Sequence, residues 1–188
     1  MDAPAVRVRI GAALRLARGT ESVHSAGASG LGYRVVDRLE RGANDGIELS
    51  AVYLLALHYG VSLGAVLQIE VPVLDREDLG TWPTGAPSLP DTEAYLRTRF
   101  REYRRIADIG TPKLARLAGV HQPWVVRFEL GSVARCDLVR VAACCDVLGG
   151  SPMNLLPPEF WTKRRGGRRV GRRRDEARDR DDRPPTNH

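Results

Sequence analysis

Residues 114–131 decide how the chain folds, and they read LARLAGVHQPWVVRFELG. Apolar residues recur at helical spacing on both sides of Gly119, in two segments that are each too short for more than a few turns. A glycine between such segments lets the backbone turn sharply, because it adopts left-handed conformations without a steric penalty. The stretch therefore predicts a helix over 111–118, a turn at Gly119-Val120 and a further helix over 121–128.

The same pattern occurs a second time, 89 residues earlier in the chain. Residues 25–42 read SAGASGLGYRVVDRLERG, and the alignment needs no gap from Leu14 opposite Tyr103 to Leu67 opposite Leu156. The identities fall on glycines, charged residues and apolar residues in a fixed order: Ala26 and Ala115, Gly30 and Gly119, Val36 and Val125, Arg38 and Arg127, Glu40 and Glu129, Gly42 and Gly131. Such matches at one offset indicate an internal duplication.

Each copy is expected to be a bundle of short helices. In the second copy, Leu96, Phe100, Tyr103 and Ala107 give an amphipathic first helix. The two helices described above follow, then a fourth over 137–148 and a fifth after Ser151. The first copy predicts helices over 10–17, 22–29, 33–39 and 48–59, with a last turn after Ser62.

Composition divides the chain into four parts. The expected fold is all-α, with a first domain over 6–68, a linker containing proline and glycine over 69–91, a second domain over 92–157 and a disordered basic tail over 158–188. The net charge is +6. Lys plus Arg balance Asp plus Glu, 18 against 18, up to Trp161, and 11 face 5 from Thr162 onward. A basic tail on a neutral body suggests an anionic polymer or surface as partner.

Several classes of function are disfavoured. Three cysteines without CxxC spacing and four dispersed histidines predict neither a disulfide framework nor a metal site. The glycines at 27, 30 and 32 follow no strand, so a phosphate-binding loop is not indicated. No spacing places a nucleophile beside a base, so we expect no enzyme activity and no cofactor. Without a secretory or membrane-spanning segment, the expected location is the cytoplasm, in association with the nucleoid.

The repeated segment can be compared with a known family. Leu114-Ala115-x-x-x-Gly119-Val120-x-x-x-x-Val125-x-x-x-Glu129-x-Gly131, followed by Gly149-x-Ser151, resembles the Xre/Cro-type helix-turn-helix family of phage and bacterial repressors. The first copy keeps most of these positions, including Gly30, Val36, Glu40, Gly42, Gly60 and Ser62. The resemblance implies two lambda-repressor-like five-helix domains, in each of which the third helix enters the DNA major groove and the second crosses the phosphate backbone.

The resemblance also implies roles for individual residues. Side chains that suit base contacts are Tyr33, Arg34, Arg38, Gln122 and Arg127, because Arg matches guanine and Gln matches adenine in the major groove. Side chains that suit phosphates are Arg41, Asn44, Thr111, Lys113 and Arg135, joined by Lys163, Arg164, Arg165, Arg168 and Arg169 of the tail. Arg15 with Glu40, and Arg104 with Glu129, are expected to pair inside the domains.

Two departures from the family pattern stand out. In the first copy, Ser25 replaces the usual leucine of the second helix and Gly27 weakens the same helix, so we expect that helix to be loose. In the second copy, Trp124 occupies a position on the reading helix. Its ring is suited either to packing in the interior or to stacking on the nucleic acid.

The resulting functional hypothesis is a sequence-specific regulator of transcription that binds double-stranded DNA. It acts as a repressor and reads two half-sites, either as a monomer on an asymmetric site or as a homodimer, with no small-molecule ligand evident. Two alternatives stay open: an architectural DNA-binding protein of the nucleoid, driven by the tail, and an antitoxin-like protein-interaction module that uses the same fold.

Overall fold

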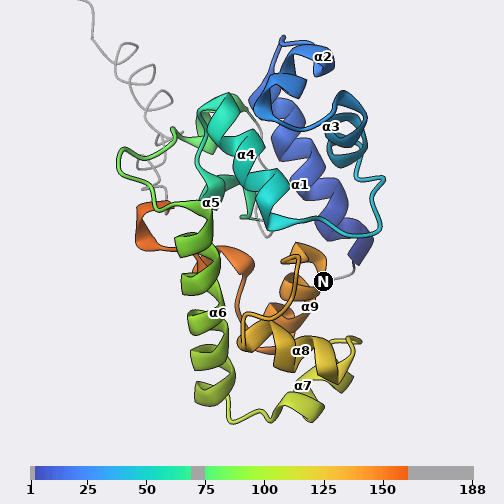
Figure 1. Cartoon of the computed structure of the whole chain (residues 1–188), viewed down its shortest axis with the longest axis vertical. Coiled ribbons are helices and arrows are strands. Elements are labelled where there is room, and N and C mark those ends of the chain that lie inside the picture. The colour runs from blue at the N-terminus through green and yellow to red at the C-terminus, as the bar shows by residue number, and fades with distance from the viewer. Residues whose placement is uncertain (1–2, 69–74, 161–188) are drawn as a thin grey trace, which may run out of the picture.

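A computed structural model of the chain describes residues 3–68 and 75–160. The described residues form helices and turns and one isolated β-bridge, so this part of the chain is all-α (Figure 1). The first half contains α1 (Ala3–Arg18), α2 (Val23–Ala26), the 3-10 turn η1 (Gly27–Ser29), α3 (Tyr33–Glu40), α4 (Leu49–Tyr59) and α5 (Leu63–Val66). The second half contains α6 (Leu89–Ile106), α7 (Thr111–Leu117), α8 (Gln122–Glu129), α9 (Leu138–Val147) and the 3-10 turn η3 (Pro152–Leu155).

The helices of the two halves begin at matching positions. The third helices, α3 and α8, begin and end 89 residues apart, and so do the starts of the fourth helices at Leu49 and Leu138. The turn before each third helix contains a glycine in the left-handed region, with φ of 91° at Gly30 and 65° at Gly119. The turn chemistry expected at both places is therefore present.

Each half buries its own apolar interior. In the first half, residues from all the main helices are fully buried, among them Ile10, Leu14, Val36, Leu49, Val52 and Leu55. In the second half the corresponding interior is more aromatic: Phe100 of α6 packs edge-to-face on Phe128 of α8, with ring centroids 5.1 Å apart. Val125 and Leu138 are fully buried beside them. Each third helix is thus fixed to its half by one apolar face.

A nearly buried glutamate at the end of the third helix joins it to the first helix. Glu129 accepts two hydrogen bonds from Arg104, at 2.6 Å from Nε and 2.9 Å from Nη2. In the first half, the expected partner Arg15 donates instead to the backbone carbonyl of Glu40, at 3.1 Å. The Glu40 carboxylate pairs with Arg18, whose Nε lies 2.9 Å from Oε1.

The exchange of partners has a simple cause. Arg18 lies one helical turn beyond Arg15, and the position that matches it in the second half is Ala107. In the first half, where both arginines are present, Arg18 forms the ion pair with the Glu40 carboxylate. Tyr59 also donates to Glu40, at 3.2 Å, and burial beside this carboxylate raises the pKa of Tyr59, so the phenol stays protonated. The pairing expected between the side chains of Arg15 and Glu40 is therefore replaced.

The described part of the linker packs against the first half. The 3-10 turn η2 (Arg76–Leu79) places Leu79 in the interior, fully buried. Trp82 donates its backbone N–H to Gly60 at 2.8 Å, and its ring lies edge-on to Tyr53 with centroids 5.0 Å apart. Helix α6 begins at Leu89, inside the range 69–91 that composition assigns to the linker. The described linker is thus a packed strap.

The beginning of the expected tail is also ordered against the first half. Residues 158–160 form a 3-10 turn, η4 (Pro158–Phe160), and Phe160 is fully buried against Tyr53 and Trp82. The buried hydroxyl of Ser62 donates to the carbonyl of Phe160 at 2.7 Å. The boundary at 158 is therefore wrong by three residues, because Phe160 supplies an aromatic side chain to the interior. The rest of the predicted tail, including its five phosphate candidates, lies outside the described residues.

The two halves meet through matching elements. Helix α1 packs against α9, and its counterpart α6 packs against α4, the counterpart of α9. Between them the segments before the fourth helices form an antiparallel bridge that joins Glu48 to Asp137. Glu48 and Asp137 are themselves 89 residues apart, so the contact pairs each segment with its own counterpart.

Candidate nucleic-acid interface

Helices α7 and α8 form a compact helix-turn-helix unit in the second half. Gly110 precedes α7, and Pro112 lies in its first turn, where its missing N–H is not needed. Leu114 and Ala115 are buried, and the N–H of Val120 donates to the carbonyl of Ala115 at 2.9 Å, which closes the turn after Gly119. This arrangement fixes the direction in which α8 leaves the turn.

The face of α8 opposite the interior is open to solvent. Gln122, Pro123 and Arg127 are exposed, whereas Val125 and Phe128 are buried on the other side. Trp124 is 7% exposed and stacks on Phe128, with ring centroids 5.0 Å apart and planes 12° apart. The tryptophan therefore packs in the interior, which was one of the two roles considered for it. Gln122 in the first turn of α8 and Arg127 in the second are therefore the exposed side chains able to form hydrogen bonds with base edges.

The first half presents a different set of side chains at the matching place. Tyr33 and Arg34 are exposed at the start of α3. The Tyr33 ring lies 4.6 Å from the ring of His24, centroid to centroid, and the Arg34 guanidinium lies 5.8 Å from the Tyr33 centroid. Arg34 also donates from Nε to the Tyr33 hydroxyl at 3.2 Å. These three side chains contact one another on the outside of α2 and α3, which sequence reasoning missed because the contacts depend on the helix crossing.

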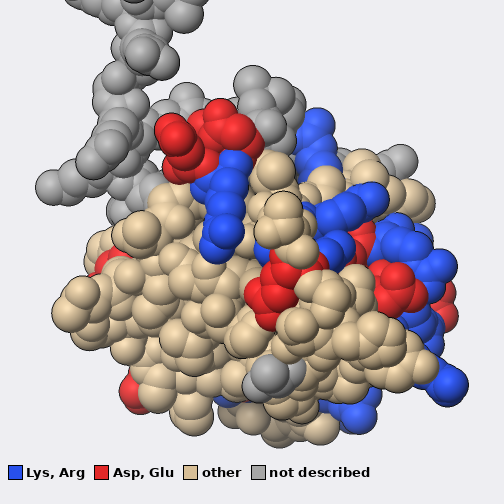
Figure 2. Space-filling view, turned by 90° about the horizontal axis from the view of Figure 1, so that it is seen from above, with Lys and Arg blue, Asp and Glu red and all other residues tan. Residues whose placement is uncertain are grey.

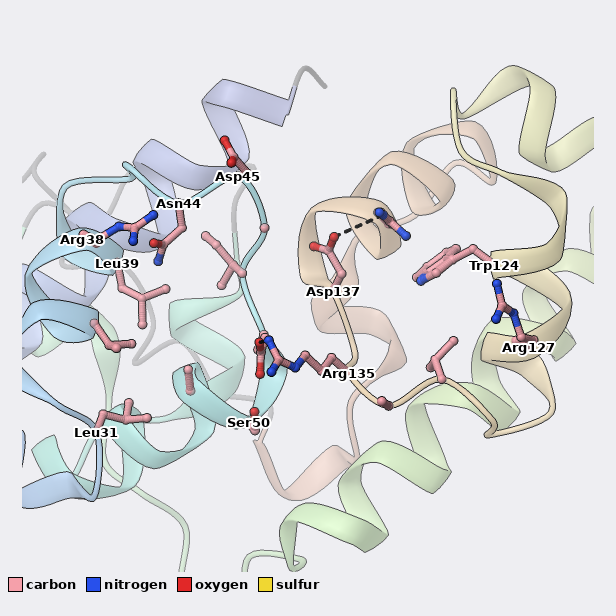
Figure 3. A pocket seen from close by; sticks show the side chains of 18 of the residues that line it. Leu31, Arg38, Leu39, Asn44, Asp45, Ser50, Trp124, Arg127, Arg135 and Asp137 are labelled. Carbon is pink, nitrogen blue, oxygen red and sulfur yellow. Dashed lines mark hydrogen bonds and ion pairs between the residues drawn. The ribbon is translucent and has the colours of Figure 1, made fainter.

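A cleft of about 920 Å³ lies between α3 and α8 (Figure 3). Arg38 on one wall and Arg127 on the other occupy matching positions, and the bridge residues Glu48 and Asp137 lie between the walls. Arg127 donates to the carbonyl of Pro123 at 3.3 Å. The structure thus brings together two of the base candidates from separate halves of the chain.

Arginine at 140 is a further basic residue of this cleft that sequence reasoning missed. Its guanidinium lies 5.6 Å from the centroid of the Trp124 ring, and its Nε lies 3.3 Å from Asp137. The position is Ala51 in the first copy, so the alignment of the two copies gave no signal. Its place three residues after the helix-capping Asp137 was the available clue.

The phosphate candidates fall into two groups. Lys113 is exposed and Thr111 is half-buried at the start of α7, beside the N–H groups of a helix terminus. Arg41 and Arg135 instead pair with carboxylates: Arg41 with Asp37 one turn earlier, and Arg135 with Glu48 of the other half at 2.8 Å. Asn44 accepts a hydrogen bond at its backbone carbonyl from Arg7, at 2.9 Å.

Basic side chains are not evenly distributed on the surface. In Figure 1, α3 and α8 lie toward the right of the molecule, with α5 and the upper part of α6 toward the left. Figure 2 shows the blue Lys and Arg side chains concentrated toward the right, with carboxylates interspersed among them. The side that carries α3 therefore combines exposed helix surface with positive charge, the combination that backbone phosphates attract.

Comparison with known families supports the description of the second half as a helix-turn-helix unit. Residues 95–155 match the family model of the helix-turn-helix domain. The matched segment runs from α6 to η3 and includes α7 and α8, so the helix-turn-helix domain contains the exposed first turn of α8. No curated protein and no solved structure gives a significant match to the chain.

Neither a membrane-spanning helix nor a metal-binding cluster is found in the described part of the chain. Across 3–68 and 75–160, no helix combines the length and apolar character of a transmembrane segment. In those same ranges, His, Cys, Asp and Glu side chains form no group of three that would hold a metal ion.

The helix-turn-helix domain matched at residues 95–155 indicates a DNA-binding regulator.

Proposed function

We propose that the chain is a sequence-specific regulator of transcription of the Xre/Cro type, which binds double-stranded DNA with two reading helices, α8 and α3. It represses by occupying promoter DNA. The single observation that carries the proposal is α8: one face is locked in the interior of a helix-turn-helix domain, while the opposite face exposes Gln122 and Arg127. A recognition helix needs this combination, because it must be positioned firmly and still reach base edges.

The reading role of α8 follows from its exposed side chains. Gln122 stands at the first position of the helix, where a carboxamide is able to pair with N6 and N7 of adenine. Arg127 lies one and a half turns later on the cleft side and suits guanine O6 and N7. Lys113 and Thr111 at the start of α7 are suitably placed to contact a phosphate of the flanking backbone.

The role of α3 follows from its match to α8 in position. Arg34 is held by its contacts with Tyr33, so less side-chain entropy is lost when the guanidinium meets a guanine. Arg38 faces the cleft from the other wall and provides a second contact. Because both helices belong to one chain, binding by one raises the effective concentration of the other at its half-site.

Ion pairs at two other arginines determine how phosphates are contacted. Arg135 and Arg41 release their carboxylate partners if they bind a phosphate, so they contribute less net affinity than Lys113, an exposed cation. The arginines of the tail act as additional phosphate contacts without base preference.

The decisive experiment is a selection of bound sequences from random double-stranded DNA. The parent chain is compared with Gln122→Ala, Arg34→Ala and a charge-matched control, Arg99→Ala, whose side chain pairs with Glu102 on α6. We expect the first two variants each to lose base preference in one half-site, and the control to select the parent sequence. Equal loss of affinity for all sequences indicates architectural binding instead, and failure of the parent to retain any duplex at low salt contradicts the proposal.

A further inference from the structure

We infer that one chain is a complete two-fold reading unit, which recognises an inverted repeat of fixed spacing and does so in a single orientation. This inference rests on the proposed function, since it specifies the DNA that the two reading helices recognise. It concerns the arrangement of the half-sites, which neither the helix-turn-helix match nor the sequence of either reading helix determines.

The first observation is the way in which the two halves exchange hydrogen bonds. The N–H of Leu49 donates to the carbonyl of Cys136 at 2.8 Å, and the N–H of Leu138 donates to the carbonyl of Ile47 at 2.7 Å. The 89-residue offset relates the two bonds. Donor Leu49 in the first half corresponds to donor Leu138 in the second, and acceptor Ile47 corresponds to acceptor Cys136. Each bond is therefore the counterpart of the other. Reciprocal contacts of this kind define a two-fold relation and are incompatible with a simple translation of one half onto the next.

The second observation is that the surrounding helices follow the same rule. Helix α1 of the first half packs on α9 of the second, and α6 of the second half packs on α4 of the first. Exchanging the two halves converts one contact into the other. The contact between halves thus resembles the isologous interface of a homodimer, made within a single chain.

The third observation is the rigidity of this contact. The four residues that exchange the bridge hydrogen bonds are all at most 2% exposed: Ile47, Leu49, Cys136 and Leu138. The strap from Leu79 to Pro87 and the buried Phe160 fasten the ends of the second half to the first. Independent movement of the halves would expose this apolar surface and leave the buried backbone groups unpaired. The separation of the reading helices is therefore fixed.

The reading helices α3 and α8 contribute residues to the same cleft. Arg38 of α3 and Arg127 of α8, which are counterparts, form opposite walls of the cleft, and the bridge lies between them (Figure 3). Two reading helices related by a two-fold axis through this cleft match the local two-fold axes that run through duplex DNA. The half-sites are then inverted about the cleft, and direct repeats do not present their base edges to both helices.

The two-fold relation does not extend to the side chains that read the bases. Tyr33-Arg34 in α3 corresponds to Gln122-Pro123 in α8, so the two half-sites have different base preferences. The ion pair between Arg135 and Glu48 has no counterpart, because Gly46 occupies the position that matches Arg135. A homodimer binds its site in either of two equivalent orientations. This chain distinguishes the two ends of its site.

The test uses the duplex obtained from the selection and three variants of it. One variant has a single half-site reversed in place, one has its spacer lengthened by five base pairs, and one by ten. We expect all three to bind at least roughly 100-fold more weakly than the parent duplex, because only one head then engages and avidity is lost. Sedimentation of the parent complex should give one chain per duplex.

Each outcome separates the inference from the proposed function. Full affinity for the reversed half-site, recovery at ten added base pairs, or two chains per duplex each overturn the inference and leave sequence-specific binding intact. Recovery at ten base pairs would show flexible tethering, because that insertion returns the displaced half-site to the same face of the helix. A further pair of duplexes tests direction: inverted repeats of either half-site alone should bind more weakly than the mixed site. Equal affinity for the mixed site and for both inverted repeats would contradict binding in a single orientation.

Discussion

The second helices of the two halves differ more than any other matching elements. In the second half, α7 is a continuous helix whose Leu114 is fully buried. In the first half, α2 ends after four residues and continues as the 3-10 turn η1. Ser25 stands where Leu114 does, and its hydroxyl lies 2.8 Å from that of Ser22 at the surface. The second half therefore anchors this helix with the buried side chains of Leu114 and Ala115, whereas the first half buries only Ala26 fully and Val23 in part.

The third helices of the two halves are held by the same kind of contact, whereas the second helices are not. The third helices keep identical bounds in both halves, because Val36 and Val125 each occupy the interior. Only the first half lacks a large buried apolar side chain in its second helix, because Ser25 occupies the position that matches Leu114. The match to the helix-turn-helix family lies on the half that retains the anchor. The comparison predicts effects of different size when the same position is changed in each half.

The largest effect is expected at the glutamate that both halves share. Glu129→Ala leaves the largely buried Arg104 guanidinium without its carboxylate and should destabilise the chain by about 3 kcal/mol. Glu40→Ala should cost a similar amount, because Arg18 and Tyr59 lose their acceptor. Urea denaturation gives both values, and Glu102→Ala, in an exposed ion pair on α6, is the control with an expected loss within about 0.5 kcal/mol. A much smaller loss for Glu40→Ala would mean that the two ion pairs are not equivalent.

The next effect tests the anchor itself. Leu114→Ala should cost about 3 kcal/mol, because it opens a cavity in the interior of the second half. Ser25→Ala should cost less than about 1 kcal/mol, since this serine is exposed. Thiol labelling provides a local readout, because all three cysteines lie in the second half and are buried. Burial raises the pKa of Cys144 to about 12, so the folded thiol stays protonated and unreactive at pH 8.

The labelling experiment also compares the two halves directly. We expect Leu114→Ala to accelerate thiol labelling in native buffer strongly, and Ser25→Ala to leave it at the rate of the parent. If both variants accelerate labelling in proportion to their loss of stability, the halves open together as one cooperative unit. If Leu114→Ala has no effect, α7 does not support the fourth helix of its half.

A smaller effect is expected at the glycines of the first half. Gly27 has a helical φ of −59°, and an added Cβ would lie 3.7 Å from the nearest atom, so Gly27→Ala should stabilise the chain by about 0.5–1 kcal/mol. Gly30 has φ of 91°, and Gly30→Ala should destabilise it by about 1 kcal/mol or more. Thermal unfolding of the two variants should shift in opposite directions. A gain from Gly30→Ala would contradict the tight turn before α3.

The smallest effect concerns the ion pair that breaks the symmetry of the bridge. A Cβ at Gly46 would lie 3.1 Å from Oδ2 of Asp137. This contact is tight, so the Asp137 side chain must shift by a few tenths of an ångström. With that shift, Gly46→Arg should supply the missing counterpart of the Arg135–Glu48 pair and add a few tenths of a kcal/mol, roughly 0.3. Gly46→Glu, of similar size and opposite charge, should lower stability by a similar amount. High salt should reduce both effects, and a salt-independent difference between the variants would indicate a steric cause.

Much of the fold was predictable because its signals are local. Glycine turns, capping positions and the 3.6-residue period place α3, α4, α7, α8 and α9 within one or two residues of their observed bounds. The offset between the copies also identified which positions would face the interior, such as Val36 and Val125. The all-α fold class is confirmed for the described part of the chain.

The features that were not predictable depend on contacts between distant segments. The bridge at Glu48 and Asp137 involves one residue from each half, too few to show a strand pattern. Arg15 and Arg18 lie one turn apart, and the sequence alone does not show which of them pairs with the Glu40 carboxylate. Proline and glycine content predicts a connection over 69–91, but composition does not show whether a connection packs. Leu79 and Trp82 were apolar clues to the packing of its described part.

The anchor at Phe160 has a consequence for how the protein is made. Phe160 belongs to the last described turn of the chain. Its ring packs against Tyr53 and Trp82, and its carbonyl accepts a hydrogen bond from the Ser62 hydroxyl. A ribosome that has released the first half has not yet synthesised this turn. The amino-terminal half therefore keeps part of its apolar surface exposed to water until residue 160 has been translated.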